Sequence, residues 1–223
     1  MTDPVDPIRV LLADDQDLVR TGLRMILEAQ SGIDVVGEAA DGREAVELAR
    51  RLRPDVCLFD IRMPELDGIE ATRLLAGSDV DDPLAIVVIT TFDLDEYVHG
   101  ALKAGARGFL LKDAGPELLV QAIRSAANGD ALIAPSITAR LLSTFAQPPQ
   151  AGGSPPQPID PLTEREEEVL VTVARGFTNA EIAGELHISL STVKSHLASL
   201  MTKLAARNRV EIAMWAYETG RLG

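Results

Sequence analysis

Four short apolar segments in the first half of this chain each end beside a residue that could take part in phosphoryl chemistry. The segments span 8–13, 56–60, 86–89 and 108–111. The polar residues at their ends are Asp14, Asp15, Asp60, Thr90 and Lys112. Short aliphatic runs of this kind are typical of strands buried on both faces of a parallel sheet. Because the carboxyl ends of such strands meet at one edge, we expect these side chains to share one site.

The three carboxylates of this set indicate a divalent metal site. Neighbouring carboxylates repel one another, and a set of oxygen ligands favours Mg²⁺. An aspartate beside such a metal can attack phosphorus and form an aspartyl phosphate. Lys112 would then neutralise the phosphoryl oxygens, and the Thr90 hydroxyl would donate a hydrogen bond to them. A generic α/β domain with polar strand ends is the simpler interpretation, but four matching ends in order argue against it.

The elements expected around these residues alternate between strand and helix. A weaker fifth strand is expected at 34–37, and helical patterns lie near 17–29, 43–53, 67–76, 95–105 and 116–128. This alternation predicts a flavodoxin-like α/β domain with a doubly wound, five-stranded parallel sheet and helices on both faces. We assign residues 8–130 to it.

The rest of the chain predicts a linker and an all-α domain. Residues 131–161 combine a short helix expected at 136–145 with a Pro- and Gly-rich linker from 147 to 158. Residues 162–223 predict four helices, with capping-box patterns that begin at Thr163 and Thr178 and a related pattern at Asn208. The two middle helices, joined by a short turn at 187–189, match a helix-turn-helix.

The distribution of charge favours nucleic-acid binding by this second domain. The 223-residue chain has a net charge of −13. Residues 186–210, however, contain no acid and four cations. The polar face of the helix expected at 191–204 carries small, hydroxyl and cationic side chains, which suit the major groove of DNA. A dimerisation module with a solvated helix face is the alternative.

Composition also bears on the compartment. No apolar run approaches the ~20 residues that a membrane span needs. The acidic first seven residues lack the apolar core of a signal peptide. The single cysteine, Cys57, cannot form an internal disulfide. We therefore expect a cytoplasmic protein that makes no use of a membrane.

Residues 8 to about 130 resemble the receiver domain of response regulators. The matching stretches are Leu-Leu-Ala-Asp-Asp-Gln at 11–16, Asp-Ile-Arg-Met-Pro-Glu-Leu-Asp-Gly at 60–68, Ile-Thr-Thr-Phe at 89–92 and Gly-Phe-Leu-Leu-Lys at 108–112. The resemblance implies that Asp60 accepts a phosphoryl group from a sensor histidine kinase. The Mg²⁺ ligands it implies are Asp14, Asp15, Asp60 and the backbone carbonyl of Arg62. Thr90 and Phe109 match the switch positions, and Lys112 matches the phosphate-binding lysine.

The same resemblance covers the loop after the acceptor. Pro64 and Gly68 match it, and we expect Gly68 to supply backbone angles that other residues resist. The residues two after the acceptor and two after the switch threonine are Arg62 and Phe92. Neither is a base that could orient water, so we expect slow self-dephosphorylation.

The second domain resembles the helix-turn-helix domain of NarL/FixJ-type (LuxR-like) regulators. The match includes Leu-Thr-Glu-Arg-Glu at 162–166, Gly-Phe-Thr-Asn-Ala-Glu-Ile-Ala at 176–183 and Ile-Ser-Leu-Ser-Thr-Val-Lys-Ser-His at 188–196. The resemblance implies that Lys194, Ser195 and Ala198 face the bases of double-stranded DNA. Thr192, Lys203 and Arg209 would contact its phosphates. It also implies homodimers that form on activation and bind repeated half-sites in promoter regions.

Together these patterns predict a two-component transcription factor rather than an enzyme. One alternative is a phosphorylation-independent DNA-binding regulator that uses the receiver as a dimerisation or ligand-sensing module. A metal-dependent phosphatase with an aspartate nucleophile is another alternative. Such enzymes place a second acid two residues after the nucleophile, where this chain has Arg62. Slow hydrolysis of its own phosphoryl group is the only catalysis that we expect.

Overall fold

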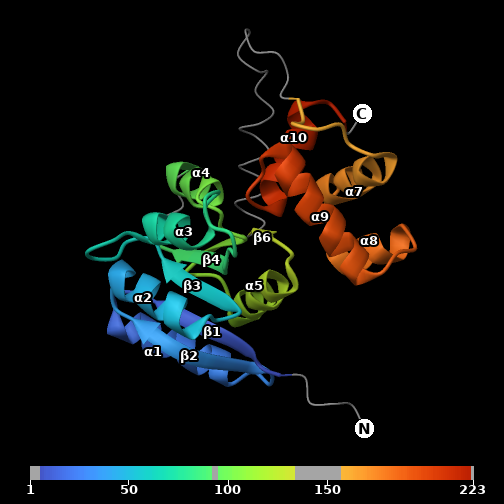
Figure 1. Ribbon diagram of the computed structural model, residues 1–223. Coiled ribbons are helices and arrows are strands. Elements are labelled where there is room, and N and C mark those ends of the chain that lie inside the picture. The colour runs from blue at the N-terminus through green and yellow to red at the C-terminus, as the bar shows by residue number, and fades with distance from the viewer. Residues whose placement is uncertain (1–5, 92–94, 134–156, 222–223) are drawn as a thin grey trace.

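The computed structural model describes residues 6–91, 95–133 and 157–221 (Figure 1). Its first domain alternates strand and helix. The strands are β1 Ile8–Ala13, β2 Ile33–Ala39, β3 Val56–Asp60, β4 Ala85–Thr90, β5 Gly108–Leu111 and β6 Leu132–Ile133. The helices are α1 Asp17–Glu28, α2 Gly42–Leu52, α3 Gly68–Ala76, α4 Asp95–Lys103 and α5 Pro116–Asn128. The predicted strand–helix alternation is therefore confirmed.

The strands form one parallel sheet in the order β2-β1-β3-β4-β5-β6, with helices packed on both faces (Figure 1). The strand order reverses between β1 and β3, which is where an open α/β sheet forms its ligand crevice. The two-residue β6, which pairs with β5, was not predicted, because so short a segment has no periodicity to detect. It lies at the start of the segment assigned to the linker. The helix predicted at 136–145 lies outside the described residues.

Strands β3 and β4 lie in the middle of the sheet and within the hydrophobic core. Every residue of both strands is buried. Burial of each large aliphatic or aromatic side chain stabilises the fold by roughly 1.5–3 kcal/mol. Capping defines the helix starts: the Asp41 and Asp67 side chains accept hydrogen bonds from the first turns of α2 and α3. Helix α2 ends just before Pro54, as predicted, with Arg53 in the left-handed region at φ 47°.

The second domain is all helical, as predicted. It consists of α7 Glu164–Ala174, α8 Asn179–Glu185, α9 Leu190–Leu204 and α10 Arg209–Glu218 (Figure 1). The capping boxes at Thr163 and Thr178 are both present, and Asn208 caps α10. The apolar face of α9 packs with α7, α8 and α10 around Trp215, which is 7% exposed. The polar face of α9 is thereby left on the surface of the domain.

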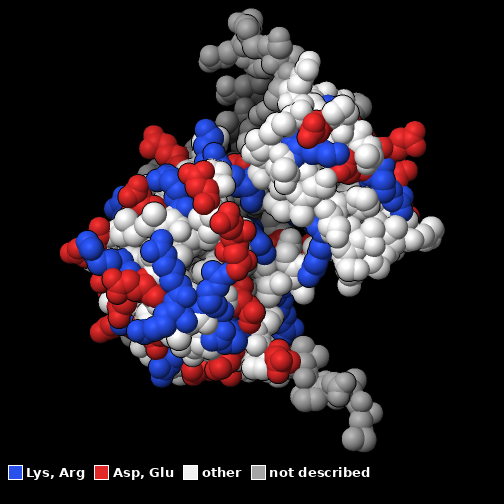
Figure 2. All heavy atoms as spheres, viewed as in Figure 1, with Lys and Arg blue, Asp and Glu red and all other residues white. Residues whose placement is uncertain are grey.

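The two domains are in contact through α4 and α10. On the face shown in Figure 2, charges of both signs cover the first domain densely, whereas the second domain presents a broad uncharged area. Among the described helices, none has both the length and the apolar character that crossing a membrane requires.

Candidate functional site

Three carboxylates meet where the neighbouring strands β1 and β3 end. Asp14 follows β1, and Asp60 is the last residue of β3. A carboxylate oxygen from each of Asp14, Asp15 and Asp60 lies within 4.8 Å of the other two. Asp14 and Asp60 are buried, at 1% and 4% exposure, while Asp15 is exposed. The structure thus brings together the three acids that the sequence placed at one edge of the sheet, with one of them open to solvent.

Lys112 supplies a positive charge to this acidic cluster. Its Nζ lies 2.6 Å from Asp14 Oδ2 and 3.1 Å from Asp60 Oδ2. Its backbone N–H donates to the Thr90 carbonyl at 2.8 Å, which ties together the ends of β4 and β5. Thr90 and Phe109 are both fully buried on these two strands. The hydroxyl and the ring that the resemblance to receiver domains assigned to a switch therefore lie on two adjacent strands.

Burial and charge compete at Asp60. Removal from water raises the pKa of Asp60 because it disfavours the carboxylate, and the Lys112 ammonium only partly offsets this rise. For Lys112, burial alone would lower the pKa, but Asp14 and Asp60 hold it above its ordinary value. One ammonium therefore faces three acids. The uncompensated negative charge and the oxygen donors fit a hard divalent cation such as Mg²⁺.

In the loop after Asp60, the expectation that Gly68 supplies unusual backbone angles is wrong. Gly68 does not have a positive φ; the left-handed residue of this loop is Glu65, at φ 64°. Glycine is required at 68 because a Cβ there would lie 1.9 Å from the Asp60 carbonyl oxygen. The Gly68 N–H donates to the Ile61 carbonyl at 2.8 Å. The loop is thus folded tightly against the backbone of Asp60.

Arg62, two residues after Asp60, is exposed and contacts α4. Its Nη2 lies 3.1 Å from the Tyr97 hydroxyl, and its guanidinium lies 5.8 Å from the centre of that ring. Sequence reasoning identified Arg62 but missed Tyr97, since only the fold brings the two together. Phe92, the other residue assigned to control of hydrolysis, lies outside the described residues.

Helix α9 presents a short surface free of acids. Lys194, Ser195 and Ala198 are exposed on it, and Thr192 is half-buried beside them. The helix begins with Ser189 as its N-cap, which accepts from the Thr192 N–H. Its opposite face contributes Val193, Leu197 and Leu200 to the core. The four residues predicted at the N-terminal half of this helix therefore lie together, in the arrangement that a major-groove helix needs.

The two domains that carry these sites each match a known protein family. Residues 10–124 match the model of the response regulator receiver domain, and residues 160–216 match that of bacterial regulatory proteins of the luxR family. The chain is a NarL/FixJ-type response regulator. Its second domain is a LuxR-type DNA-binding domain, and proteins of this family regulate transcription rather than act as classical enzymes.

Relatives of this response regulator match along nearly the whole chain. The transcriptional regulatory protein YxjL of Bacillus subtilis is 42% identical over 216 residues, 96% of this chain and 97% of that protein. The crystal structure of ChrA, from a heme-sensing two-component system, is 36% identical with a TM-score of 0.53, covering 98% of this chain and all of that one. A structure of RcsB in complex with DNA is 27% identical with a TM-score of 0.56, covering 96% and 99%.

Two residues assigned to DNA phosphates are engaged elsewhere in this response regulator. Lys203 forms an ion pair with the buried Glu166, at 2.7 Å, and donates to the Pro161 carbonyl at 3.1 Å. Arg209 Nη1 lies 2.9 Å from Asp130 Oδ1 of the receiver and 2.7 Å from Asn179 Oδ1. Arg209 can reach DNA only if it leaves this contact. The contact of Arg209 with DNA therefore stays a prediction, and it requires the two domains to be arranged differently.

Sequence reasoning missed the residues that join the two domains. Asp130 Oδ1 also accepts from the Asn179 N–H at 2.9 Å. Asn208, 3% exposed, donates through Nδ2 to the carbonyls of Leu102, at 2.9 Å, and Ala106, at 3.1 Å. A buried asparagine of this kind could have been noticed only as a helix cap, which is the role the sequence gave it. Its second role, as a donor to carbonyls of the receiver, depends on the position of the end of α4 in the tertiary structure.

Proposed function

We propose that phosphorylation of Asp60 by a partner sensor histidine kinase controls homodimerisation and sequence-specific binding of this protein to promoter DNA. The observation that carries this proposal is the buried Asp60 carboxylate at the end of β3, with Lys112 Nζ at 3.1 Å and two further acids within 4.8 Å. The proposed compartment is the cytoplasm, which holds the chromosomal DNA that the second domain would read.

The acidic cluster fits the Mg²⁺ that receiver domains use. Asp14, Asp15, Asp60 and the backbone carbonyl of Arg62 would hold the ion. When bound, it would offset the negative charge on the carboxylates and on the phosphoryl oxygens. The three acids and single ammonium described above support this assignment, because they leave negative charge without a partner.

The chain's own residues account for the phosphoryl transfer. An Asp60 carboxylate oxygen would form a bond to phosphorus, while the bond from phosphorus to the imidazole nitrogen of the kinase breaks and that nitrogen keeps the electron pair. Lys112, already between Asp14 and Asp60, would pair with a phosphoryl oxygen. The Thr90 hydroxyl would turn to donate to the new group, and Phe109 would move into the space it leaves. This rearrangement would shift the population of domain arrangements.

The DNA-reading part of the proposal rests on α9. Lys194, Ser195 and Ala198 are exposed at its N-terminal half and could enter the major groove, with Thr192 beside a phosphate. The similarity to RcsB, which has been solved with DNA, supports this use of the domain. A single small domain reads only a short half-site, so a dimer on repeated half-sites would supply the affinity.

Substitution of Asp60 by asparagine tests the proposal. The amide side chain keeps the shape of the carboxylate but is not a nucleophile toward phosphorus. We expect a phosphodonor with Mg²⁺ to raise DNA affinity at least roughly tenfold for the wild type, and not at all for Asp60→Asn. Fragment-library binding would measure affinity, and light scattering would measure dimerisation. An equal response in both proteins would instead favour a receiver that acts without phosphorylation.

A further inference from the structure

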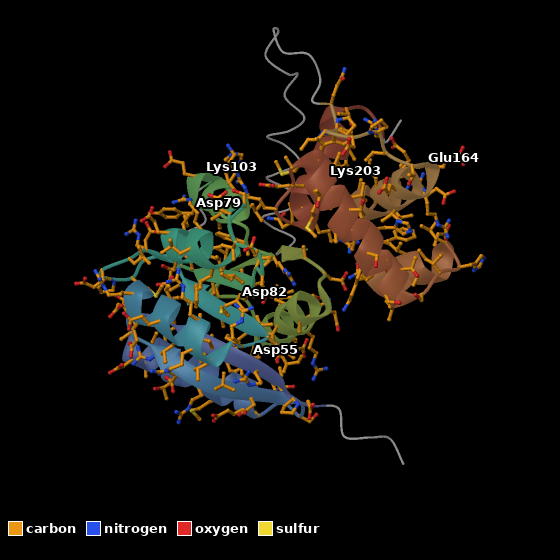
Figure 3. The ribbon with its side chains drawn as sticks, in the orientation of Figure 1. Asp55, Asp79, Asp82, Lys103, Glu164 and Lys203 are labelled. Carbon is orange, nitrogen blue, oxygen red and sulfur yellow. The ribbon has the colours of Figure 1, made fainter. Side chains whose placement is uncertain are left out.

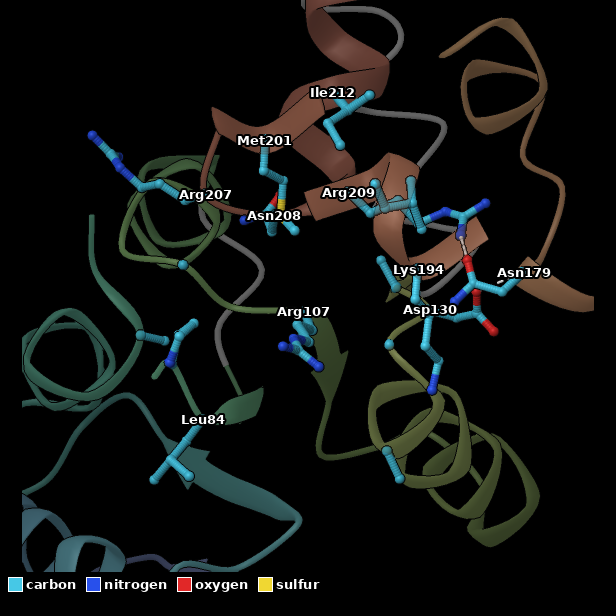
Figure 4. Close-up of a pocket in the computed structure, with 17 residues that line it drawn as sticks. Leu84, Arg107, Asp130, Asn179, Lys194, Met201, Arg207, Asn208, Arg209 and Ile212 are labelled. Atoms are coloured by element: carbon cyan, nitrogen blue, oxygen red, sulfur yellow. Dashed lines mark hydrogen bonds and ion pairs between the residues drawn. The ribbon is translucent and has the colours of Figure 1, made fainter. Parts of the chain in front are cut away.

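A cavity of about 250 Å³ lies between the receiver and the DNA-binding domain. Its receiver wall comes from the residues just before β4 and β5 and from the C-terminal ends of α3 and α5, and its other wall comes from the start of α8, α9, α10 and the turn before α10 (Figure 4). Leu84, Leu197, Met201 and Ile212 give it an apolar portion. The cavity is far too small for a nucleic-acid segment, and below the usual ~300–1,000 Å³ of pockets for drug-sized ligands. It could hold a compact small molecule.

The charged groups around this cavity are mostly cations. Arg107, Lys194, Arg207 and Arg209 line it, against the single acid Asp130 among the described residues. Asp130 already has two partners, because its Oδ1 accepts hydrogen bonds from both the Arg209 guanidinium and the Asn179 N–H. Arg207 has its own partners in Glu211, at 3.6 Å, and the Lys103 carbonyl. The cations therefore exceed the acidic groups available to pair with them.

Two of these cations have no acidic partner in the described part of the chain. Arg107 donates through Nη1 only to the Ala126 carbonyl, at 3.3 Å, and Lys194 is exposed at the cavity edge. In Figure 4 the Arg107 guanidinium lies near the middle of the set of lining residues, and Lys194 extends from α9 toward the receiver. Burial lowers the pKa of Arg107, since no carboxylate offsets its desolvation.

Arg209 is a further buried cation of the same wall. Its side chain is only 11% exposed, and Nη1 makes the contacts to Asp130 and Asn179. Its Nη2 is buried and has no hydrogen-bond partner among the described residues. A buried guanidinium N–H without an acceptor is unfavourable, because it has lost its hydrogen bonds to water. An oxyanion in the cavity would pair with Arg107 and Lys194 and would offset the charge of the nearby Arg209 guanidinium.

We propose that this interdomain cavity binds a compact organic polyanion, with phosphate or carboxylate groups for its cations and a short carbon skeleton for its apolar wall. Arg107 comes from the receiver, whereas Lys194 and Arg209 come from the DNA-binding domain, so the bound anion holds the two domains together. The same Lys194 is assigned to DNA. The anion and DNA therefore compete, and the ligand acts as a negative effector that is independent of Asp60.

Direct binding to the full chain tests the site without reference to DNA. Citrate and glycerol 3-phosphate would be titrated by calorimetry at constant ionic strength, so that the carboxylate and phosphate sources are compared. We expect at least one of them to bind with a dissociation constant in the millimolar range or below. Arg107→Gln should weaken that binding by roughly tenfold or more, because a charge-assisted contact is lost. Arg51→Gln, at an exposed position on α2, is the matched control.

Lys194→Gln provides a second variant at an exposed position, where folding is not at stake. This substitution should weaken the binding of the same anion in the calorimetric titration. Circular dichroism would verify that Arg107→Gln is folded. The site is disproved if neither anion binds the wild type, or if both variants bind as Arg51→Gln does. These results would leave the DNA-binding proposal intact.

A separate experiment tests the effector role, which rests on the proposed DNA binding. At constant ionic strength the anion should weaken DNA binding by the wild type several-fold and should weaken DNA binding by Arg107→Gln much less. Equal weakening in both proteins would mean that the anion acts by charge screening alone, and the effector role would be rejected. Absence of DNA binding under every condition would count against the proposed function, while the calorimetric result would still decide the site.

Discussion

At the scale of single residues, Glu166 shows how one buried acid organises the DNA-binding domain. It is 4% exposed, and its carboxylate accepts from Ser199 at 2.6 Å and Lys203 at 2.7 Å while it closes the capping box with Thr163. Burial alone would raise the pKa of Glu166, but these hydrogen bonds lower it from 4.5 to about 2. The N-terminus of α7 is thereby fixed to α9, the helix that carries the proposed DNA contacts.

Glu166→Gln should therefore destabilise the domain in a pH-dependent way. The folded pKa lies below the unfolded one, so the stabilisation is complete above about pH 4.5 and is lost as the pH falls toward 2. We expect a loss of about 1–2 kcal/mol in the free energy of unfolding at pH 7. The loss should shrink below about pH 4.5. Fluorescence of Trp215, the chain's single tryptophan, reports unfolding of this domain.

Glu164→Gln is the control for this measurement, because it makes the same charge change at an exposed position in the same helix turn (Figure 3). Its free energy of unfolding should change little at any pH. If Glu166→Gln were as stable as this control at neutral pH, the hydrogen-bonded carboxylate would have no stabilising role.

Arg62 bears on how long the phosphorylated state would last. Its guanidinium is directed to Tyr97, and it offers no base to orient an attacking water. We expect the phosphorylated protein to lose its phosphoryl group over minutes or longer. Decay of the radiolabelled protein, purified away from any kinase, would measure this lifetime. Complete loss within seconds would show that another group activates water.

At the scale of elements, α9 divides its surface between two tasks. Its C-terminal half is held inside the domain through Lys203 and Ser199, both bonded to Glu166. Its N-terminal half keeps Lys194, Ser195 and Ala198 exposed. Of the two lysines predicted to contact DNA, only Lys194 is free of a protein carboxylate in the described structure. The proposed reading surface is therefore the N-terminal half of the helix.

Lys194→Ala should lower DNA affinity by roughly tenfold, since it removes one charge-assisted contact. If Lys194 binds a phosphate, affinity should fall equally for all sequences and the salt dependence should decrease by about one unit. If it binds a base, sequence preference should relax instead. Fluorescence anisotropy over a range of salt concentrations separates these outcomes. Arg175→Ala, an exposed cation at the end of α7, is the control, and equal losses in both variants would remove Lys194 from the reading surface.

At the scale of the whole molecule, the domain contact links the receiver to the DNA-binding surface. Asn208 and Arg207 hold the carbonyls at the end of α4, while Asp130 holds Arg209 and Asn179. Because Arg209 and Asn179 belong to the helices around α9, this contact fixes the orientation of the proposed reader. Release of the contact would free Arg209 for a phosphate.

Asp130→Ala should loosen this contact and free Arg209, without changing any residue of α9 or of the acidic cluster. It removes the ion pair at 2.9 Å and the acceptor for the Asn179 N–H. We expect the unphosphorylated variant to bind DNA roughly tenfold more tightly and to have a larger radius of gyration in X-ray scattering. Glu47→Ala, exposed on α2, controls for the loss of a negative charge. Unchanged DNA affinity in Asp130→Ala would mean that the domain contact does not restrain the reader.

The sequence by itself determined the parallel α/β fold, the helix-turn-helix and the meeting of Asp14, Asp15, Asp60 and Lys112. These conclusions were available because strand ends, helix periodicity and capping patterns depend on residues close together in the chain. The parallel sheet then converts the order of the strands into proximity at one edge. Even Gly68 was identified correctly, although the reason is a close approach to the Asp60 carbonyl rather than unusual backbone angles.

Only the tertiary structure decided how the cations of the second domain are used. Lys194, Lys203 and Arg209 look alike in the sequence, as basic residues in an acid-free stretch. The fold leaves the first exposed, pairs the second with Glu166 and buries the third against Asp130 of the receiver. The partner of a long, flexible cation depends on which acid lies within a few ångströms of its tip. No local pattern encodes that distance between segments 37 to 79 residues apart.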